Sequence, residues 1–272
     1  MTAPASVQHY YERSDEDGRF KAADGEIEFL RTKDILIRHL PAGSLRIADV
    51  GGGSGPYAFW LSNLGHEVHL LDLVSKHIRI ATERNKSEKH RIASAQVGTA
   101  TKLPFADGQF DVVLLMGPLY HLPEPTDRAT ALLEAKRVLK PGGILFAAYI
   151  SRFASLLDGY RSNLVADPEF RSILAEDLAS GRHHGSADGS PKYFTDAYLH
   201  RPEDIEQEAV SAGFQPVHLL SVEGFGWLVP GFAELWNDTV RRANLLQALT
   251  RVEKERSLLG VSAHLMLVAR IA

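Results

Sequence analysis

The sequence predicts an α/β fold with a doubly wound, mostly parallel sheet of about seven strands, and two observations carry that prediction. Short apolar segments alternate with helical ones from Leu45 to Ile150, at a spacing typical of strand–helix–strand crossovers. A glycine-rich turn follows the first of these strands directly. The chain has 272 residues, of which 44% are hydrophobic and 24% charged, so we expect one domain over residues 1–272.

The first part of the chain, residues 1–44, is predicted to be an N-terminal helical arm. Apolar residues recur at roughly helical spacing from Glu26 to Leu40, and the segment 41–44 (PAGS) ends that helix. Tyr10 and Tyr11 lie earlier in the arm, where they could close a pocket from this side.

Residues 45–150 form the predicted cofactor-binding core. Strands are expected at 45–50, 67–73, within 91–98, at 110–116 and at 144–150, and helices at 56–64, 75–85 and 126–139. The segment 110–116 (FDVVLLM) is apolar on both alternating faces, as expected of a strand buried in a parallel sheet.

Beyond Ile150 the regular alternation breaks twice. Residues 151–201 show helical stretches, a glycine-rich patch at 181–189 and no clear strand, and residues 224–260 are mostly helical. A helix at 202–212 and a strand at 215–222 lie between them, and 263–271 is expected to close the sheet as an antiparallel strand. We interpret the two interruptions as helical insertions that form a lid over a substrate.

Composition narrows the function. The net charge is −4 with both signs interspersed, which disfavours a nucleic-acid partner. The absence of cysteine excludes disulfides, thiolate metal sites and cysteine nucleophiles. Neither a signal-peptide core nor a run of membrane-spanning length is present, so the sequence predicts a cytoplasmic protein without a membrane partner. The oligomeric state stays open.

The glycine-rich turn, residues 49–55 (DVGGGSG), indicates a bound ligand. Gly51, Gly53 and Gly55 can adopt dihedrals forbidden to other residues, and the following helix presents its N-terminal amides to whatever lies on the loop. The loop alone fits either a dinucleotide such as NAD or S-adenosylmethionine. Asp49, ahead of the first glycine, suits a ligand that carries an ammonium group.

A second acid follows the second strand. Asp72 stands at the strand's carboxyl end, where its two oxygens could accept hydrogen bonds from both hydroxyls of a ribose. The competing interpretations are a helix cap or a surface acid.

Three segments in order resemble the motifs of class I S-adenosylmethionine-dependent methyltransferases. Asp49-x-Gly51-x-Gly53-x-Gly55 matches that family's first motif, residues 98–111 (GTATKLPFADGQFD) resemble the stretch before its fourth strand, and residues 139–143 (LKPGG) resemble the turn before its fifth. The chain is most similar to the small-molecule branch related to ubiquinone-type methyltransferases.

The resemblance implies roles by position. Asp49 would lie near the methionine amino group, Asp72 would hold the ribose, and Leu73 would pack on the adenine. The remaining implied cofactor contacts are Gly51, Gly52, Gly53 and Gly55 beneath the methionine, Thr99 and Ala100 at the adenine edge, and Met116, Gly117 and Pro118 beside the methionine. The family usually has an acid where this chain has Thr99, and a hydroxyl accepts a hydrogen bond less strongly than a carboxylate.

The predicted activity is methyl transfer from S-adenosylmethionine to a small-molecule acceptor. His121, just past the fourth strand, could take a proton from that acceptor, bind it, or cap the next helix. The substrate candidates are Tyr11, Tyr120, His121, Arg152, Phe153, Tyr198 and Trp227. Other aromatic residues of the insertions, among them Phe194 and Trp236, are expected mainly to form the insertions' own cores.

Alternatives remain open from the sequence. A methyltransferase acting on protein or RNA, an NAD-dependent oxidoreductase and a non-catalytic S-adenosylmethionine-binding protein all accommodate parts of the pattern. No metal site is predicted, because His183 and His184 are neighbours in a glycine-rich segment and are expected to lie in a solvated loop.

Overall fold

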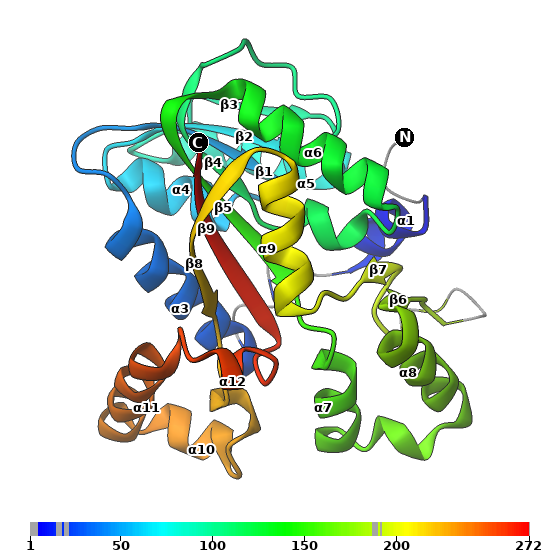
Figure 1. Ribbon diagram of the computed structural model, residues 1–272. Helices are drawn as coiled ribbons and strands as arrows, with labels where there is room; N and C mark the ends of the chain where they lie inside the picture. The colour runs from blue at the N-terminus through cyan, green and yellow to red at the C-terminus, as the bar shows by residue number, and fades with distance from the viewer. Residues whose placement is uncertain (1–4, 15–17, 19–21, 187–189, 191, 272) are drawn as a thin grey trace.

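The computed structural model describes residues 5–14, 18, 22–186, 190 and 192–271. Seven strands form one sheet in the order β3-β2-β1-β4-β5-β9-β8 (Figure 1). The strands are β1 Arg46–Val50, β2 Glu67–Asp72, β3 Ser94–Val97, β4 Phe110–Leu115, β5 Leu139–Ile150, β8 Phe214–Ser221 and β9 His264–Ile271. The first five pair in parallel, whereas β9 runs antiparallel to both neighbours. The predicted sheet is therefore confirmed, including its reversed last strand.

Helices cover both faces of this sheet. On one face lie α3 Ala23–His39, α4 Pro56–Asn63 and α5 Ser75–Ser87; on the other lie α6 Pro125–Val138 and α9 Pro202–Ser211. The sequence of β4 is apolar throughout because both faces of the strand are buried. Val112 and Leu114 belong to one buried cluster, and Val113 and Leu115 belong to the other.

The start of β5 differs most from the sequence prediction. The strand β5 begins at Leu139, five residues earlier than expected, because Leu139 already pairs with Phe110 before the register shifts and Ile144 pairs with Val112. Gly142, with φ +75°, lies within this irregular stretch. The residues of the expected turn are thus a bulge inside a longer strand.

The first insertion contains α7 Ala154–Arg161, η2 Leu164–Ala166 and α8 Pro168–Ser180. It also contains a strand pair that sequence periodicity missed, β6 Arg182–His183 and β7 Ala197–Tyr198. Two residues per strand are too few to give an alternation signal. Residues 187–189 of the predicted glycine-rich patch lie outside the described residues.

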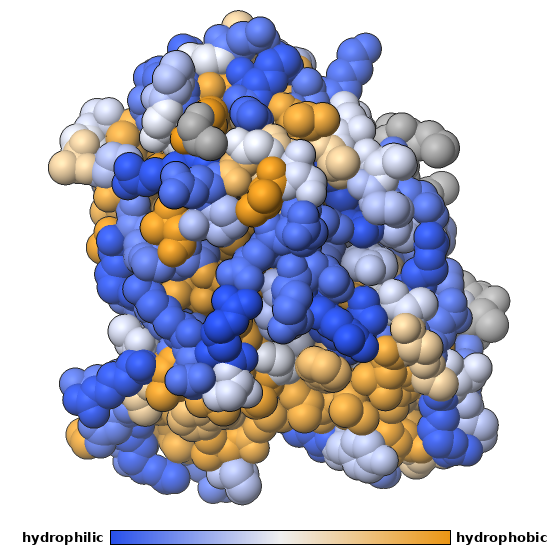
Figure 2. Space-filling model, in the orientation of Figure 1, coloured by the Kyte–Doolittle hydropathy of each residue, from blue (hydrophilic) through white to orange (hydrophobic). Residues whose placement is uncertain are grey.

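The second insertion contains η3 Gly226–Leu228, α10 Phe232–Asn237, α11 Thr239–Val252 and α12 Arg256–Leu259. Both insertions lie below the same edge of the sheet in Figure 1, and hydrophobic residues gather over this lower part of the surface in Figure 2. This is the edge at which β5 and β8 end and β9 begins. Two further described helices are α1 Ala5–Arg13, in the N-terminal arm, and the 3-10 helix η1 Pro118–His121, which follows β4.

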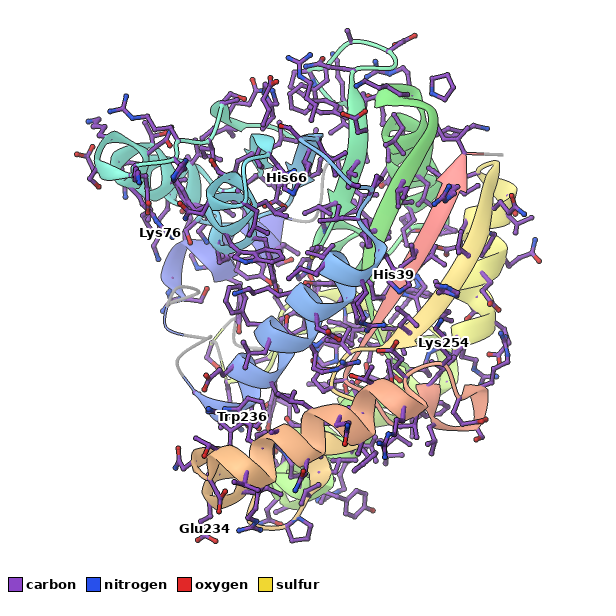
Figure 3. The ribbon with its side chains drawn as sticks, turned by 90° about the vertical axis from the view of Figure 1, so that its left-hand side faces the viewer. His39, His66, Lys76, Glu234, Trp236 and Lys254 are labelled. Atoms are coloured by element: carbon purple, nitrogen blue, oxygen red, sulfur yellow. The ribbon has the colours of Figure 1, made fainter. Side chains whose placement is uncertain are left out.

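The second insertion is held against α3. Figure 3 shows α11 crossing beneath α3, with Trp236 near the beginning of α3, where its Nε1 donates to Glu26 Oε2 at 2.8 Å. At the other end of α11 the buried Glu253 carboxylate accepts hydrogen bonds from Arg31 at 2.6 Å and from Arg38 at 2.7 Å. No helix in the described part of the chain is long and apolar enough to cross a membrane.

Candidate active site

A cavity of about 520 Å³ opens at the carboxyl edge of the sheet, and it has two walls. The glycine-loop wall comes from the ends of β1 to β4 and comprises residues 51–54, 71–74, 98–100 and 116–118. The far wall comes from α3, α7, η3 and the ends of the β9–β8 part of the sheet, and comprises Asp24, Glu28, Asp158, Arg161, Glu223, Trp227 and His264. Because β1 to β4 lie on one side of β5 in the sheet order, the two walls belong to different halves of the fold.

The glycine loop needs its glycines for two reasons. Gly51, Gly53 and Gly55 have φ values of +76°, +59° and +88°, which disfavour other residues. At Gly51 a Cβ atom would also lie 2.5 Å from the Pro118 ring, whereas at Gly53 it would meet only the His77 ring at 4.0 Å. The backbone at Gly53 is therefore open for a ligand to approach. Gly55 caps α4 and does not line the cavity.

Asp72 joins the loop to the end of β2. Its Oδ2 accepts from the Gly53 amide at 2.8 Å, and its Oδ1 accepts from the Val74 amide at 2.8 Å and lies 3.1 Å from His77 Nδ1. The carboxylate is buried but lines the cavity. It thus holds the loop in shape and retains lone pairs toward the cavity.

Asp49 lies behind the loop and not on the cavity wall. Its side chain is fully buried, and a Cβ at Gly52 would lie 2.5 Å from its Oδ2. Among the described residues neither oxygen has a hydrogen-bond partner of good geometry. Burial raises the pKa of Asp49 to about 7, the Asp72 charge adds to this, and the Ala58 backbone amide opposes it. The expected position of Asp49 near a ligand ammonium group stays a prediction, and the loop would lie between the two.

The other implied contacts of the glycine-loop wall lie on the cavity: Leu73, Thr99, Ala100, Met116, Gly117 and Pro118. The Thr99 hydroxyl accepts from the Thr101 amide at 3.3 Å and lies 3.0 Å from the Thr101 hydroxyl. The Thr99 hydroxyl thus already uses part of its hydrogen-bonding capacity within the protein. Less of that capacity is left for the role that the family's acid would take at the adenine edge.

His121 is enclosed by aromatic rings. Its Nε2 lies 2.8 Å from the Tyr11 hydroxyl and its Nδ1 lies 3.2 Å from the Asp196 carbonyl oxygen. The rings of Tyr11, Tyr120 and Phe194 surround it with centroids 4.7–5.5 Å away. Burial lowers the pKa of His121 to about 4, so it is neutral and weakly basic near pH 7. This environment favours a structural contact over the general-base role considered from the sequence.

A histidine–carboxylate pair lies on the far wall. The Glu223 Oε1 and His264 Nδ1 atoms are 2.6 Å apart, and Glu223 Oε2 accepts from the Ser262 hydroxyl at 3.0 Å and the His264 amide at 2.9 Å. Glu28 Oε2 lies 4.0 Å from the same Nδ1. Burial would raise the pKa of Glu223, but the charge and hydrogen bonds of His264 hold it below its usual range. The carboxylate is therefore ionised.

Arg161 links several segments of the far wall, and we call its set of contacts the clasp. Arg161 of α7 donates to both oxygens of Asp24 on α3 at 2.9 and 3.0 Å, and to the Trp227 carbonyl oxygen at 3.2 Å. Its guanidinium lies 5.1 Å from the Trp227 ring centroid. One side chain thus joins the N-terminal arm to both insertions beside the cavity.

Three predicted substrate residues lie elsewhere. Arg152 is buried and donates to the Leu199 carbonyl oxygen at 2.7 Å, which ties the end of β5 to the first insertion. Tyr198 lies against the Arg128 guanidinium at 4.0 Å, and the Phe153 ring packs close to Gly260. None of the three lines the cavity, whereas Tyr11, Tyr120, His121 and Trp227 do.

The expectation of a solvated loop at His183 and His184 is wrong for the first of them. His183 is buried on β6, lines the cavity and has its Nδ1 2.9 Å from the buried Asp177 carboxylate, while His184 is exposed. Phe194 also lines the cavity, but Trp236 belongs to a separate cluster within the second insertion.

Comparisons with known proteins identify the family. Residues 48–147 match the methyltransferase domain family. The ubiquinone/menaquinone biosynthesis C-methyltransferase of Neisseria meningitidis serogroup C is 30% identical over 192 residues, which cover 67% of this chain and 71% of that protein. The chain belongs to the class I S-adenosylmethionine-dependent methyltransferases. It is therefore an enzyme whose methyl donor is S-adenosylmethionine, and the NAD alternative is set aside.

Other relatives of this methyltransferase agree. The ubiquinone biosynthesis O-methyltransferase of Thiobacillus denitrificans is 32% identical over 133 residues, which cover 47% of this chain and 54% of that protein. A solved S-adenosylmethionine-dependent methyltransferase from Methanosarcina mazei superposes with a TM-score of 0.60 at 20% identity, covering 87% of this chain and 96% of that one. A solved S-adenosylmethionine-dependent methyltransferase from Thermotoga maritima, described as a possible histamine N-methyltransferase, superposes with a TM-score of 0.59 at 16% sequence identity. The match covers 98% of this chain and 99% of that one. The structural matches support the fold.

Sequence reasoning missed most charged residues of this methyltransferase's far wall. Glu223 lies two residues past the end of β8 and His264 begins the antiparallel β9, so attention to strand ends, as for Asp72, could have indicated both. Their pairing across 41 positions left no local signal. Asp24 and Arg161, 137 positions apart, meet only because α7 returns toward α3.

Proposed function

We propose that this methyltransferase acts on a small molecule that lies between the two walls of the cavity, with S-adenosylmethionine on the glycine-loop wall. The observation that carries the proposal is the single cavity of about 520 Å³ that both walls line. Enclosure of this kind suits a small acceptor better than a protein or RNA chain. The relatives named for ubiquinone and menaquinone biosynthesis also favour a small acceptor.

The residues on the glycine-loop wall fit the cofactor. The open backbone at Gly53 provides a cradle that any Cβ would narrow, and the Asp72 carboxylate beside it could accept from ribose hydroxyls. In our proposal Leu73, Thr99 and Ala100 contact the adenine, and residues 116–118 lie beside the methionine. Asp49 supports the amino group from behind the loop, where an ionised carboxylate would favour a cation.

When bound, S-adenosylmethionine supplies an electrophilic methyl group, and the protein's main task is to hold the acceptor in line with it. Tyr120, Phe194 and Trp227 offer aromatic surface on which the acceptor could pack. We propose that the arm and the two insertions form the lid, because Tyr11, Phe194 and Trp227 bring all three segments to one cavity.

The test measures cofactor binding and the fate of the methyl group. Calorimetry should detect S-adenosylmethionine and S-adenosylhomocysteine and give no signal with NAD. Methyl-labelled S-adenosylmethionine is then incubated with the enzyme and either a metabolite extract, its protein fraction or its RNA. Label in the low-molecular-mass fraction is expected. Label confined to protein or RNA would overturn the proposal.

A further inference from the structure

The short helix η1 starts at the glycine loop and carries two side chains of the cavity wall. Its first residue packs against the loop so closely that a Cβ atom at Gly51 would lie 2.5 Å from the Pro118 ring. Tyr120 and His121, at its other end, line the cavity. The orientation of η1 therefore sets how the aromatic surface proposed for the acceptor stands relative to the loop proposed for the methyl donor.

The far end of η1 is held by Arg128 of α6, a residue that does not line the cavity. Arg128 Nη1 donates to the Leu122 carbonyl oxygen and to the Pro123 carbonyl oxygen, each at 2.9 Å. The last carbonyl groups of a helix have no partner within it, and a buried carbonyl group that lacks a hydrogen bond is costly. One guanidinium thus satisfies both of the carbonyl groups that follow η1.

Arg128 is itself fixed along its other edge. Only 3% of the residue is exposed, its Nε donates to Glu208 Oε1 of α9 at 2.8 Å, and its Nη2 lies 2.8 Å from the same oxygen. The guanidinium carbon lies 4.0 Å from the centroid of the Tyr198 ring of β7. Because the donors of an arginine lie in one rigid plane, the bond to Glu208 decides where Nη1 points. The position of η1 is thus tied to α9 and to the first insertion.

We propose that Arg128 is a positioning residue for methyl transfer and that it acts through η1. It holds the helix at the angle at which an acceptor packed on Tyr120 faces the methyl donor on the glycine loop. This role rests on the proposed function and extends it to a residue outside the cavity. Methyl transfer is sensitive to such a residue because the reacting atoms must be in line, and a misplacement of about 1 Å can cost about 100-fold in rate.

The alternative is that Arg128 only ties α6 to α9 through its ion pair with Glu208. The two tasks use different atoms, since Nε and Nη2 face the carboxylate whereas Nη1 faces the carbonyl groups. Arg128→Lys keeps a positive charge for Glu208 but has no planar fork with which to reach both carbonyl groups as well. Glu208→Gln removes the negative charge and leaves Nη1 where it is. The two variants therefore separate the two tasks.

The same helix offers a matched control in Arg137. Its guanidinium also donates to two backbone carbonyl oxygens, those of Leu103 at 3.1 Å and Phe105 at 2.8 Å, and to a carboxylate, that of Glu134 at 2.7 Å. Neither Leu103 nor Phe105 lines the cavity. Arg137→Lys thus removes the same kind of fork from α6 without touching η1.

The first arm of the test needs no acceptor. Hydrogen–deuterium exchange is followed by mass spectrometry with S-adenosylhomocysteine bound, and it is read in a peptide that covers residues 117–123. Arg128→Lys should speed exchange in this peptide by about tenfold, because η1 loses the donor that holds its end, whereas Arg137→Lys should leave the peptide unchanged. Unchanged exchange in Arg128→Lys would overturn the proposal.

The second arm measures turnover. Methyl-labelled S-adenosylmethionine, at a saturating concentration, is incubated with the low-molecular-mass fraction of a metabolite extract, and the rates of labelling are compared. Arg128→Lys should lower the maximal rate by about 10- to 100-fold, with the affinity for S-adenosylhomocysteine changed by less than about threefold. Glu208→Gln and Arg137→Lys should each lower the rate by less than about threefold, because η1 keeps its donor.

Two results of the second arm would overturn the proposal. Equal rate losses in Arg128→Lys and Glu208→Gln would show that the ion pair matters and the carbonyl bonds do not. Loss of S-adenosylhomocysteine binding in Arg128→Lys would show that Arg128 supports the glycine loop as well as η1. A wild-type enzyme that labels no small molecule would instead refute the proposed function, and the exchange measurement would still decide whether Arg128 holds η1.

Discussion

The two walls of the cavity are built in different ways. The glycine-loop wall consists of short segments that each follow a strand directly, and backbone amides and one carboxylate give it its shape. The far wall is assembled from side chains that are 41 to 137 positions apart and meet through ion pairs and hydrogen bonds. Local backbone geometry thus defines the wall that we propose for the donor, and tertiary packing defines the wall that we propose for the acceptor.

This difference explains how one fold can keep its methyl donor while its acceptor changes. Substitutions in the far wall alter pocket chemistry without touching the strand-to-helix turns that hold the loop. The variants below test whether the two walls are as independent as the structure implies.

The largest effect is expected at Glu253, which links the end of α11 to α3, a helix that contributes residues to the far wall. Glu253→Ala removes the buried carboxylate that pairs with both Arg31 and Arg38, so that of its ion pairs Arg31 keeps only the one with the exposed Asp34, and it should lower the free energy of unfolding by about 3–5 kcal/mol. Urea denaturation measures this, with Glu88→Ala, which removes an exposed i,i+4 pair, as the control. A loss below about 1 kcal/mol would show that α11 does not depend on this cluster.

His121, between the walls, should give stability a pH dependence. Its folded-state pKa of about 4 lies below the ordinary value of 6.5, so the unfolded chain gains a proton first as the pH falls. The stability it contributes is present above pH 6.5 and is lost as the pH falls toward 4. The difference in unfolding free energy between wild type and His121→Asn should shrink by up to about 3 kcal/mol over that window. A difference that stays constant across the titration would contradict the burial of the ring.

On the glycine-loop wall, Asp72→Ala should weaken S-adenosylmethionine binding by about 1–3 kcal/mol, because charge-assisted hydrogen bonds are lost. Asp72→Asn keeps the shape and one acceptor oxygen, and should fall between wild type and alanine. Calorimetry measures both. Unchanged affinity in Asp72→Ala would remove the ribose role.

The smallest effect on stability is expected at the clasp of the far wall. Arg161→Met should cost less than about 1 kcal/mol of unfolding free energy, since its ion pairs are partly exposed. It should nevertheless raise KM for the acceptor and leave cofactor affinity intact. Arg256→Met, which removes a similar two-pronged pair outside the cavity, is the matched control. Equal KM values in both variants would argue that the clasp does not close the pocket.

The accuracy of the sequence predictions follows the same division. Strand alternation and glycine spacing predicted the sheet because those signals are local, and the resemblance to class I methyltransferases implied twelve cofactor residues, of which ten lie on the cavity wall. Asp49 lies behind the loop and off the cavity wall, since spacing does not say which way a side chain turns, and its place near the methionine amino group stays a prediction. Arg152 was chosen because it directly follows a strand, and Tyr198 because it is an aromatic residue of the first insertion; instead, Arg152 donates to the Leu199 carbonyl oxygen and its guanidinium lies over the Tyr198 ring.

The position of β9 has a consequence for the order in which the molecule is made. It lies between β5 and β8, so β8 has no partner in the main sheet until β9 has been inserted. During synthesis the donor half can fold while its ribosome is still translating the rest, but His264 reaches Glu223 only after the final strand emerges. The nascent chain can therefore form the proposed donor site well before the far wall is complete.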